Sequence, residues 1–333
     1  MGVKLRDLVV QKPITLQELA GKTLMVDAYN TLYQFITTIR SMDGGLFTDE
    51  NGNVTSHLMG LFNRCTNFSK HKLHPVFVFD GKVPALKKAE LDRRKDIKSE
   101  AGSLYEEAKE KGDVADMKKY AARTSRLTLS MIKDAKTLLV AMGIPCVQAP
   151  AEGEAQAAHM VAKGDGWAVV SQDFDSLLHK APRLVINLNI AGRRKRGLSS
   201  VPVEPAIINL KQTLEKLELT QQQLIMLAML VGTDYSGGVK GIGPKKALAL
   251  ILKHKTEKVF AEAKWDEHNN VPWQEVYETF TKMPTTDDYD LEGKEYNKDK
   301  VYDFLMNRGF SPDRVKKTLE SLPDTQQKRL GDW

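Results

Sequence analysis

Acidic side chains recur in this sequence directly after short apolar runs, which is where the active sites of α/β proteins form. Apolar runs at 22–26, 76–79 and 167–170 are followed by Asp27, Asp80 and Asp173. Four further acids accompany them: Glu152, Glu154, Asp175 and Asp234. A single Asp after a strand is usually a turn former or a helix cap. Seven such acids are harder to explain in that way, and we expect them to meet at one edge of a sheet.

Two of these acids, Glu152 and Glu154, stand just past Pro150, where a predicted helix begins and continues to about Lys163. Side chains two positions apart point in nearly opposite directions along a helix, because each residue turns by about 100°. The two carboxylates can therefore converge only at the helix start, with Glu152 on the entering loop and Glu154 in the first turn. The affinity of acids for the positive end of the helix macrodipole would explain the pair equally well.

Clustered carboxylates repel each other, by about 4 kcal/mol for two unit charges about 4 Å apart at an effective dielectric of 20. A compensating cation is therefore expected, and Mg²⁺ prefers oxygen ligands. Zinc is disfavoured, because no His or Cys accompanies the acids. Seven acids exceed the needs of one ion, so we expect two Mg²⁺ about 4 Å apart, with Mn²⁺ as a substitute. That arrangement drives the hydrolysis of phosphodiesters.

The elements that would position these acids alternate between strand and helix. Periodicity and apolar runs predict helices at 30–40, 55–70, 121–142, 220–231, 244–253 and 256–263, and further strands at 144–147 and 184–188. Such alternation is typical of an α/β fold with a central, largely parallel sheet flanked by helices on both faces. The charged segment 87–119 has few large apolar residues and is predicted to form helices that project from the sheet.

Composition sets broad limits. The chain has 333 residues, of which 41% are hydrophobic and 28% charged, which suits one large or two medium globular domains. A net charge of +6 permits a polyanionic partner without establishing one. Cys65 and Cys146 have no metal-site spacing, the N-terminus lacks a signal-peptide run, and no stretch approaches the ~20 apolar residues of a membrane span. We expect an intracellular, monomeric protein.

Five motifs, taken in order, resemble the flap structure-specific endonucleases of the XPG nuclease family, specifically the archaeal type. They are VDAY at 26–29, VFDGK at 78–82, APAEGEAQA at 149–157, SQDFD at 171–175, and VGTDY at 231–235 with GIGPK at 241–245. The resemblance runs almost end to end. It implies a PIN-like nuclease fold with a projecting helical arch, in the cytoplasm or nucleoid of an archaeon, or in the nucleus if the source is eukaryotic.

The resemblance also implies roles for individual residues. The implied ligands of a first Mg²⁺, some acting through water, are Asp27, Asp80, Glu152 and Glu154, and those of a second are Glu154, Asp173, Asp175 and Asp234. Lys87 and Arg94, which fall on one helix face, are implied to steer the scissile phosphate. Tyr33 matches a tyrosine that stacks on a base near the cut. Without the resemblance, a solvated helix face and a core tyrosine would be the simpler explanations.

The glycine-rich run at 241–246 resembles a helix-hairpin-helix-type element, whose backbone N–H groups and helix N-terminus hold a phosphate. The implied DNA contacts are Lys240, Gly241, Gly243, Lys245 and Lys246. The family also binds a monovalent cation there, which the sequence leaves open. Arg193 and Arg194 belong to a basic run that is a second candidate contact, although a solvated loop tip explains it as well.

The C-terminal residues resemble the motif by which replication proteins dock on the PCNA-type sliding clamp, with Gln327, Leu330 and Trp333 as its anchors. The motif usually carries a second aromatic residue, but this chain stops at Trp333. Either docking is weakened or a terminal residue is missing. A disordered tail with a chance Gln and Leu is the alternative.

The resemblance divides the chain into five regions. They are an N-terminal nuclease region (1–98), a helical arch or linker (99–128), an internal nuclease region (129–258) with the helix-hairpin-helix-type element around 232–254, C-terminal helices (259–322) and a clamp-binding tail (323–333). The implied function is Mg²⁺-dependent 5′-flap endonuclease and 5′→3′ exonuclease activity at branched DNA, in Okazaki fragment maturation and long-patch base excision repair. The alternatives are a relative that cuts bubbles, recessed ends or four-way junctions, an RNA nuclease of a related fold, and a non-catalytic DNA-binding clamp partner.

Overall fold

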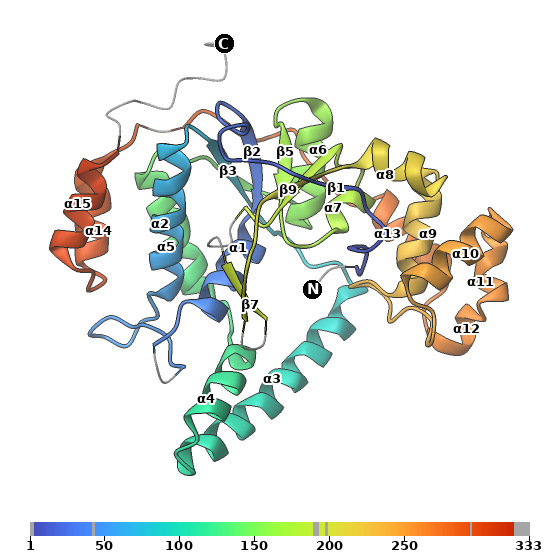
Figure 1. The fold of residues 1–333 in the computed structure, drawn as a ribbon, viewed down its shortest axis with the longest axis horizontal. Coiled ribbons are helices and arrows are strands. Elements are labelled where there is room, and N and C mark those ends of the chain that lie inside the picture. Colours follow the sequence, from blue (N-terminus) through green and yellow to red (C-terminus); the bar gives the residue numbers. More distant parts are fainter. Residues whose placement is uncertain (1–2, 42–43, 189–192, 197–198, 294, 323–333) are drawn as a thin grey trace. The chain divides into compact units, whose positions relative to one another are not determined.

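A computed structural model describes residues 3–41, 44–188, 193–196, 199–293 and 295–322 (Figure 1). Seven strands form one sheet in the order β1-β9-β6-β5-β2-β3-β4, and β7 and β8 form a separate hairpin. The strands are β1 Gln11–Pro13, β2 Thr23–Asp27, β3 His74–Phe79, β4 Cys146–Gln148, β5 Ala168–Val170, β6 Arg183–Ile186, β7 Arg193–Arg196, β8 Ser199–Pro202 and β9 Ala206–Asn209.

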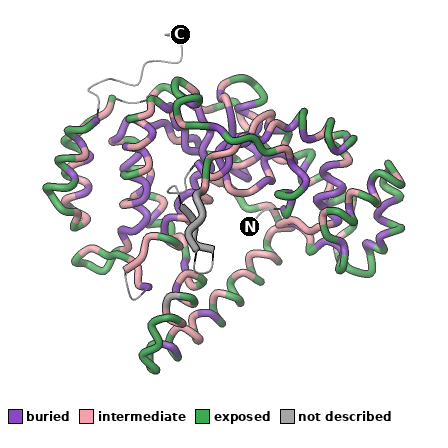
Figure 2. Tube along the Cα trace, viewed as in Figure 1, coloured by how far each residue is buried: buried purple, intermediate pink, exposed green. Residues whose placement is uncertain are grey.

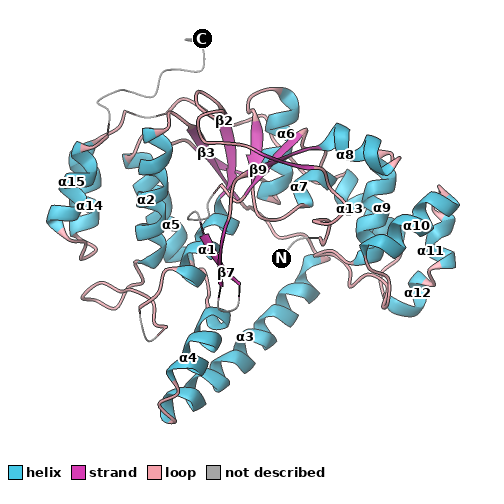
Figure 3. Ribbon diagram, viewed as in Figure 1, coloured by secondary structure: helices cyan, strands magenta, loops and turns pink. Residues whose placement is uncertain are grey.

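Helices make up most of the remaining described chain (Figure 3). The first half contains α1 Ala28–Thr38, α2 Ser56–Lys70, α3 Lys87–Glu110, α4 Val114–Ala121, a 3₁₀ turn at Ala122–Thr124, α5 Leu129–Ala141 and α6 Gly153–Lys163. The second half contains α7 Asp175–Leu178, α8 Leu210–Leu217, α9 Gln221–Val231, α10 Pro244–His254, α11 Lys258–Glu262, α12 Trp265–His268, α13 Trp273–Thr281, α14 Lys298–Met306 and α15 Pro312–Glu320. None of the helices in the described ranges is long and apolar enough to cross a membrane.

The centre of the sheet is parallel, as the sequence predicts. Strand β2 pairs with β5, with Val26 opposite Val170, and β5 pairs with β6 in the same direction. Their side chains are buried, which explains the continuous apolar runs. At one edge, β9 lies antiparallel to β6, and β1 lies antiparallel to β9. The sequence did not predict β1, because its three residues, Gln11–Pro13, are all exposed and carry no apolar pattern.

The predicted helix at 121–142 is wrong at its N-terminal part. Helix α5 begins at Leu129, where the side chain of Thr128 accepts the N–H of Met131 as a helix cap. Upstream, Ser125 is buried and its Oγ donates to the carbonyl of Ala122 at 3.0 Å. Ser and Thr side chains that bond to the local backbone in this way compete with helix formation. The segment 125–128 therefore breaks the helix.

The chain folds as two compact units, each built from discontinuous segments. The first unit comprises Met1–Asp27, Val78–Leu91 and Gln148–Asp288, and the second comprises Ala28–Phe77, Asp92–Val147 and Tyr289–Trp333. In the first unit, α6 packs against β2, β5 and α7, and α9 packs against α10 and α13. In the second, α2 packs against α1 and α5, and α14 packs against α5 and α15. The seven acids and Lys87 belong to the first unit, and Arg94 and Tyr33 to the second.

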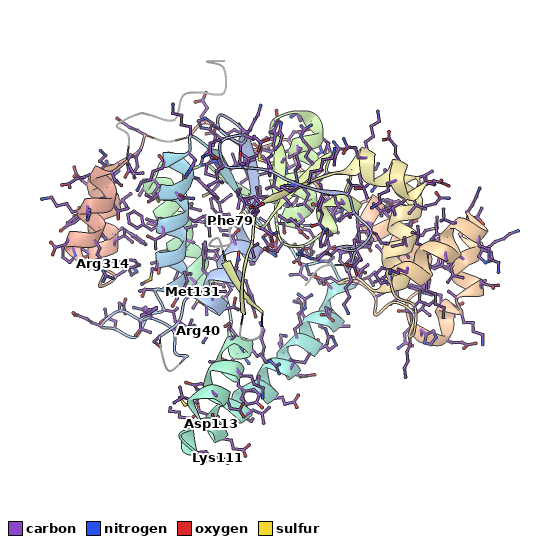
Figure 4. All side chains as sticks on the ribbon, in the orientation of Figure 1. Arg40, Phe79, Lys111, Asp113, Met131 and Arg314 are labelled. Carbon is purple, nitrogen blue, oxygen red and sulfur yellow. The ribbon has the colours of Figure 1, made fainter. Side chains whose placement is uncertain are left out.

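The charged segment 87–119 forms helices, as predicted, in α3 and α4. The buried residues of α3 are Ala101 and Ala108, and exposed and half-buried positions dominate both helices (Figure 2). Lys111 and Asp113 mark the turn between them (Figure 4), and the Asp113 side chain caps α4 by accepting two backbone N–H groups. The stability of these helices therefore depends on local caps and ion pairs more than on a core.

Candidate active site

The acids that the sequence predicts to meet lie at strand ends and helix starts of the first unit. Asp27 ends β2, Asp80 directly follows β3, and Asp173 lies between β5 and α7. Parallel strands share one carboxyl edge, so the in-register pairing of β2 with β5 places Asp27 beside Ser171. Asp175 begins α7, and Asp234 lies in the turn after α9.

The structure links all seven acids through the charge of at least one neighbouring acid. Glu154 is repelled by Asp175, Asp27 and Asp173. Asp234 in turn repels Asp80, Glu152 and Asp175. Among the described residues, however, no group of three or more His, Cys, Asp or Glu side chains is arranged to hold a metal ion directly. Protein groups engage several of these carboxylates instead.

Helix α6 begins as predicted, with Glu152 at its N-cap and Glu154 in its first turn. Gly153 donates its N–H to Asp80 Oδ1 at 2.7 Å. A Cβ atom at position 153 would lie 2.7 Å from the same oxygen, a distance that real Cβ atoms do not show. Glycine thus lets the helix start approach the carboxylate of Asp80, which a larger residue would displace.

Lys87 supplies a positive charge inside the acidic cluster. Its Nζ lies 2.6 Å from Glu152 Oε2 and 3.4 Å from Asp234 Oδ2. The Lys87 side chain is only 16% exposed. Burial alone would lower the pKa of Lys87, but the charges of Glu152 and Asp234 outweigh burial and raise it. Lys87 therefore acts as an internal counterion for Glu152 and Asp234.

Burial disfavours the ionised form of three further carboxyl groups: Glu154, Asp175 and Asp80. Burial raises the pKa of Glu154 well above its ordinary value, and the charges of Asp175 and Asp27 raise it further. Burial also raises the pKa of Asp175 to about 7, against the lowering effect of the Val3 N–H, which donates to Oδ1 at 2.9 Å. For Asp80, burial raises the pKa more than the charge of Lys87 lowers it. This set of oxygen donors fits a hard divalent cation, which would stabilise the ionised forms.

Metal ions should therefore stabilise the fold most at high pH. The pKa of Asp175 is about 7 in the folded chain, against about 4 in an unfolded chain. As the pH rises from about 4 to about 7, the unfolded state releases this proton before the folded state does, so the metal-free fold loses stability. In calorimetry, we expect the Tm in EDTA to fall over this interval. Mg²⁺ at one fixed concentration, about 100 times its Kd at pH 8, should raise the Tm at pH 8 by ~5 °C, and by less at pH 5, where its affinity is lower.

The variant Asp175→Asn is the control for this titration, because it removes one carboxyl with a raised pKa. The Tm of the metal-free variant should depend less on pH than that of the parent chain. An equal Mg²⁺ effect at both pH values would contradict the electrostatic account.

Two predicted catalytic residues lie in the second unit. Tyr33, on α1, donates its O–H to the carbonyl of Ser125 at 2.8 Å, and Lys98 Nζ lies 4.7 Å from the centre of its ring. Tyr33 is therefore a half-buried, hydrogen-bonded residue rather than a fully buried core side chain. Arg94 lies on α3, seven positions beyond Lys87, and is half-buried. The roles of Arg94 and Tyr33 stay predictions.

The predicted glycine-rich element forms an exposed helix start. Gly243 is the N-cap of α10, Pro244 occupies its first turn, and Gly241 has a φ of +82°, a conformation that favours glycine. The five predicted DNA contacts in this element are all exposed: Lys240, Gly241, Gly243, Lys245 and Lys246. The sequence therefore places three lysines at a helix N-terminus, a geometry suited to a phosphate.

Some predicted site residues cannot be placed. Arg193 and Arg194 form part of the hairpin strand β7, paired with β8, but their side chains are outside the described part of the structure. Gln327, Leu330 and Trp333 also lie outside the described residues. Their proposed contacts stay predictions.

Sequence reasoning missed several of the groups that contact the acids. The backbone N–H of Val3 holds Asp175, and the hydroxyl of Ser171 lies between Asp27 and Glu154. A backbone donor leaves no trace in residue types, so no pattern could have revealed Val3. Ser171 stands inside the motif at 171–175, but a serine after a strand is also an ordinary turn residue.

Two family models and several curated proteins match this chain. The XPG N-terminal domain matches residues 1–101, and the XPG I-region matches residues 143–234. Flap endonuclease 1 of Staphylothermus marinus is 47% identical and covers 97% of this chain and 94% of that protein. Flap endonuclease 1 of Thermofilum pendens is 48% identical and covers 100% of this chain and 99% of that protein.

Solved structures match as well. The flap endonuclease-1 from Methanococcus jannaschii has a TM-score of 0.76 and 38% identity, and the match covers 96% of this chain and 98% of that one. The catalytic core of Rad2 in complex with DNA substrate has a TM-score of 0.71 at 22% identity, over 97% of this chain and 100% of that one. At that identity the second match shows the fold alone.

Proposed function

The chain belongs to the flap endonuclease 1 branch of the XPG nuclease family, and from this premise we propose how its residues cut branched DNA. It is a structure-specific flap endonuclease, a nuclease of DNA replication and repair. We propose 5′→3′ exonuclease activity in addition, with roles in Okazaki fragment maturation and long-patch base excision repair in an archaeal nucleoid. The observation that carries this function is the gathering of seven acids whose charges act on one another, in a chain matched over its full length.

Nucleases of the XPG family use divalent metal ions, and we propose that two Mg²⁺ bind here. The first would be held by Asp27, Asp80, Glu152 and Glu154, and the second by Glu154, Asp173, Asp175 and Asp234. When bound, such ions help water attack the phosphodiester and neutralise charge on the departing oxygen. The protein supplies the orientation: Gly153 fixes Asp80, and Val3 fixes Asp175.

We propose that Lys87 and Arg94 act on the scissile phosphate. Lys87 is already desolvated, and a buried cation stabilises developing negative charge far better than an exposed one. Its contacts with Glu152 and Asp234 hold it at the acidic cluster before DNA arrives. Arg94 lies on the same face of α3, and Tyr33 offers an aromatic ring for stacking on a base.

DNA binding would come from charge and shape rather than base identity. We propose that the exposed start of α10 holds a phosphate of the duplex through Lys240, Lys245 and Lys246 and the N–H groups near Gly241 and Gly243. A monovalent cation at this element and contacts from Arg193 and Arg194 belong to the same proposal.

Binding of a PCNA-type sliding clamp through Gln327, Leu330 and Trp333 is proposed from the sequence motif. Deletion of 327–333 should remove clamp stimulation and leave basal cleavage intact.

A side-by-side cleavage assay tests the function. The purified chain is given 5′-flap, bubble, nicked and four-way DNA substrates of equal length, each with Mg²⁺ and with EDTA. We expect the 5′-flap to be cut near the single-strand junction at least tenfold faster than the bubble and four-way substrates, and only with Mg²⁺. Faster cleavage of bubbles or four-way junctions would show that the chain has the substrate specificity of another XPG-family nuclease. Binding of the flap without cleavage would indicate a non-catalytic clamp partner.

A further inference from the structure

Ser171 is a buried hydroxyl at the centre of the acidic cluster, with a relative exposure of 1%. Its Oγ lies 3.0 Å from Glu154 Oε1 and 3.2 Å from Asp27 Oδ2. The backbone N–H of Asp173 donates to the same Oγ at 3.2 Å. One hydroxyl thus contacts three of the acids proposed as metal ligands.

The backbone that carries this hydroxyl is fixed by the sheet. The N–H of Ser171 donates to the carbonyl of Val185, and the preceding residue, Val170, pairs with Val26 on β2 and with Val185 on β6. Glu154 comes from α6, which packs against β2 and β5. A rigid strand end therefore presents the Ser171 side chain to groups from a strand, a helix and a turn.

A serine hydroxyl has one donor and two acceptor positions. One acceptor position is taken by the Asp173 N–H, and the single proton can go to only one of the two carboxylates at a time. Residues that bond to a metal ligand in this way fix its orientation, and their loss typically costs about 10- to 100-fold in metal affinity or activity. The orientation of Glu154 should affect metal binding most, because both proposed ion sites include this residue.

We propose that Ser171 is a positioning residue for the flap endonuclease reaction. It holds the carboxylates of Asp27 and Glu154, together with the turn that carries Asp173, in the arrangement that receives metal. It touches no substrate and acts through these three acids. The inference rests on the proposed function of the acidic cluster.

The test compares Ser171→Ala with a matched control, Ser176→Ala. Ser176 is also fully buried, five positions further along, but its Oγ has no hydrogen-bond partner among the described residues. For each DNA-free protein, the Kd for Mn²⁺ is measured by electron paramagnetic resonance. Single-turnover cleavage of a 5′-flap is measured over a range of Mg²⁺ concentrations, and DNA affinity is measured in Ca²⁺.

We expect Ser171→Ala to weaken Mn²⁺ binding by about 10- to 100-fold and to shift the Mg²⁺ dependence of cleavage upward by a similar factor. Its DNA Kd should stay within about threefold of the parent value. Ser176→Ala should match the parent chain in all three measurements. Ser171→Thr keeps the hydroxyl, so its Mn²⁺ affinity should be close to that of the parent chain. If the threonine variant does not fold, the comparison of Ser171→Ala with Ser176→Ala is sufficient to test the role of Ser171.

Equal or tighter Mn²⁺ binding by Ser171→Ala, relative to Ser176→Ala, would overturn the positioning role. A loss of thermal stability equal in both alanine variants, with no difference in metal affinity, would do so as well. Failure of the underlying function looks different: the parent chain itself would bind no Mn²⁺ and cut no flap.

Discussion

Asp175→Asn should lower the single-turnover rate of 5′-flap cleavage by at least about 10³-fold while leaving DNA affinity within about tenfold. The substitution removes a negative charge, yet the amide oxygen can still accept the N–H of Val3 that now bonds to Oδ1 at 2.9 Å. The fold and its N-terminal contact should therefore persist, and the loss would report on metal binding alone. Cleavage is measured with Mg²⁺ in excess, and affinity is measured in Ca²⁺.

The control is Asp266→Asn, the same chemical change at an exposed position in the first turn of α12. It should leave rate and affinity unchanged. If Asp175→Asn cut flaps at a rate similar to that of the control, Asp175 would not be a metal ligand and the proposed second ion site would be wrong.

The second large effect concerns Lys87, for which we expect two changes of opposite sign. Lys87→Met keeps most of the side-chain volume but removes the charge that lies 2.6 Å from Glu152 and 3.4 Å from Asp234. In the DNA-free chain, Mn²⁺ no longer competes with this ammonium group for the carboxylates, so its affinity should rise by up to about tenfold. Flap cleavage should fall by about 10²- to 10³-fold, because a desolvated cation is lost from the scissile phosphate.

Lys88→Met is the matched control, since Lys88 is the next residue on α3 and is exposed. It should change neither quantity appreciably. Weaker Mn²⁺ binding by Lys87→Met would show that the lysine supports the metal site rather than balancing it. Unchanged cleavage would remove Lys87 from the reaction.

Several parts of the acidic cluster could be predicted from the sequence alone. The start of α6 was predicted correctly, with Glu152 on the entering loop and Glu154 in the first turn, because two acids two positions apart can converge only where a helix begins. Asp27 and Asp80 were placed correctly at strand ends, because buried parallel strands give continuous apolar runs. The confirmed family resemblance depended on these same segments.

Other features depend on tertiary contacts that residue patterns do not encode. The antiparallel edge of the sheet, β9 with β1, involves a strand whose side chains are exposed. The helix break at 125–128 follows from hydrogen bonds of Ser125 and Thr128, which propensity alone did not reveal. Likewise, the contacts of Val3 and Ser171 with the acids join positions that lie far apart in the chain.

We propose that the sheet gathers distant acids into a cluster that needs divalent cations to be fully ionised. Crystals of the chain soaked in Mn²⁺ test this most directly, because Mn²⁺ is located by its anomalous scattering. We predict two peaks, one beside Asp27, Asp80 and Glu154 and one beside Asp173 and Asp175. A map without peaks at these carboxylates, or with the side chains turned into separate regions of solvent, would contradict the account.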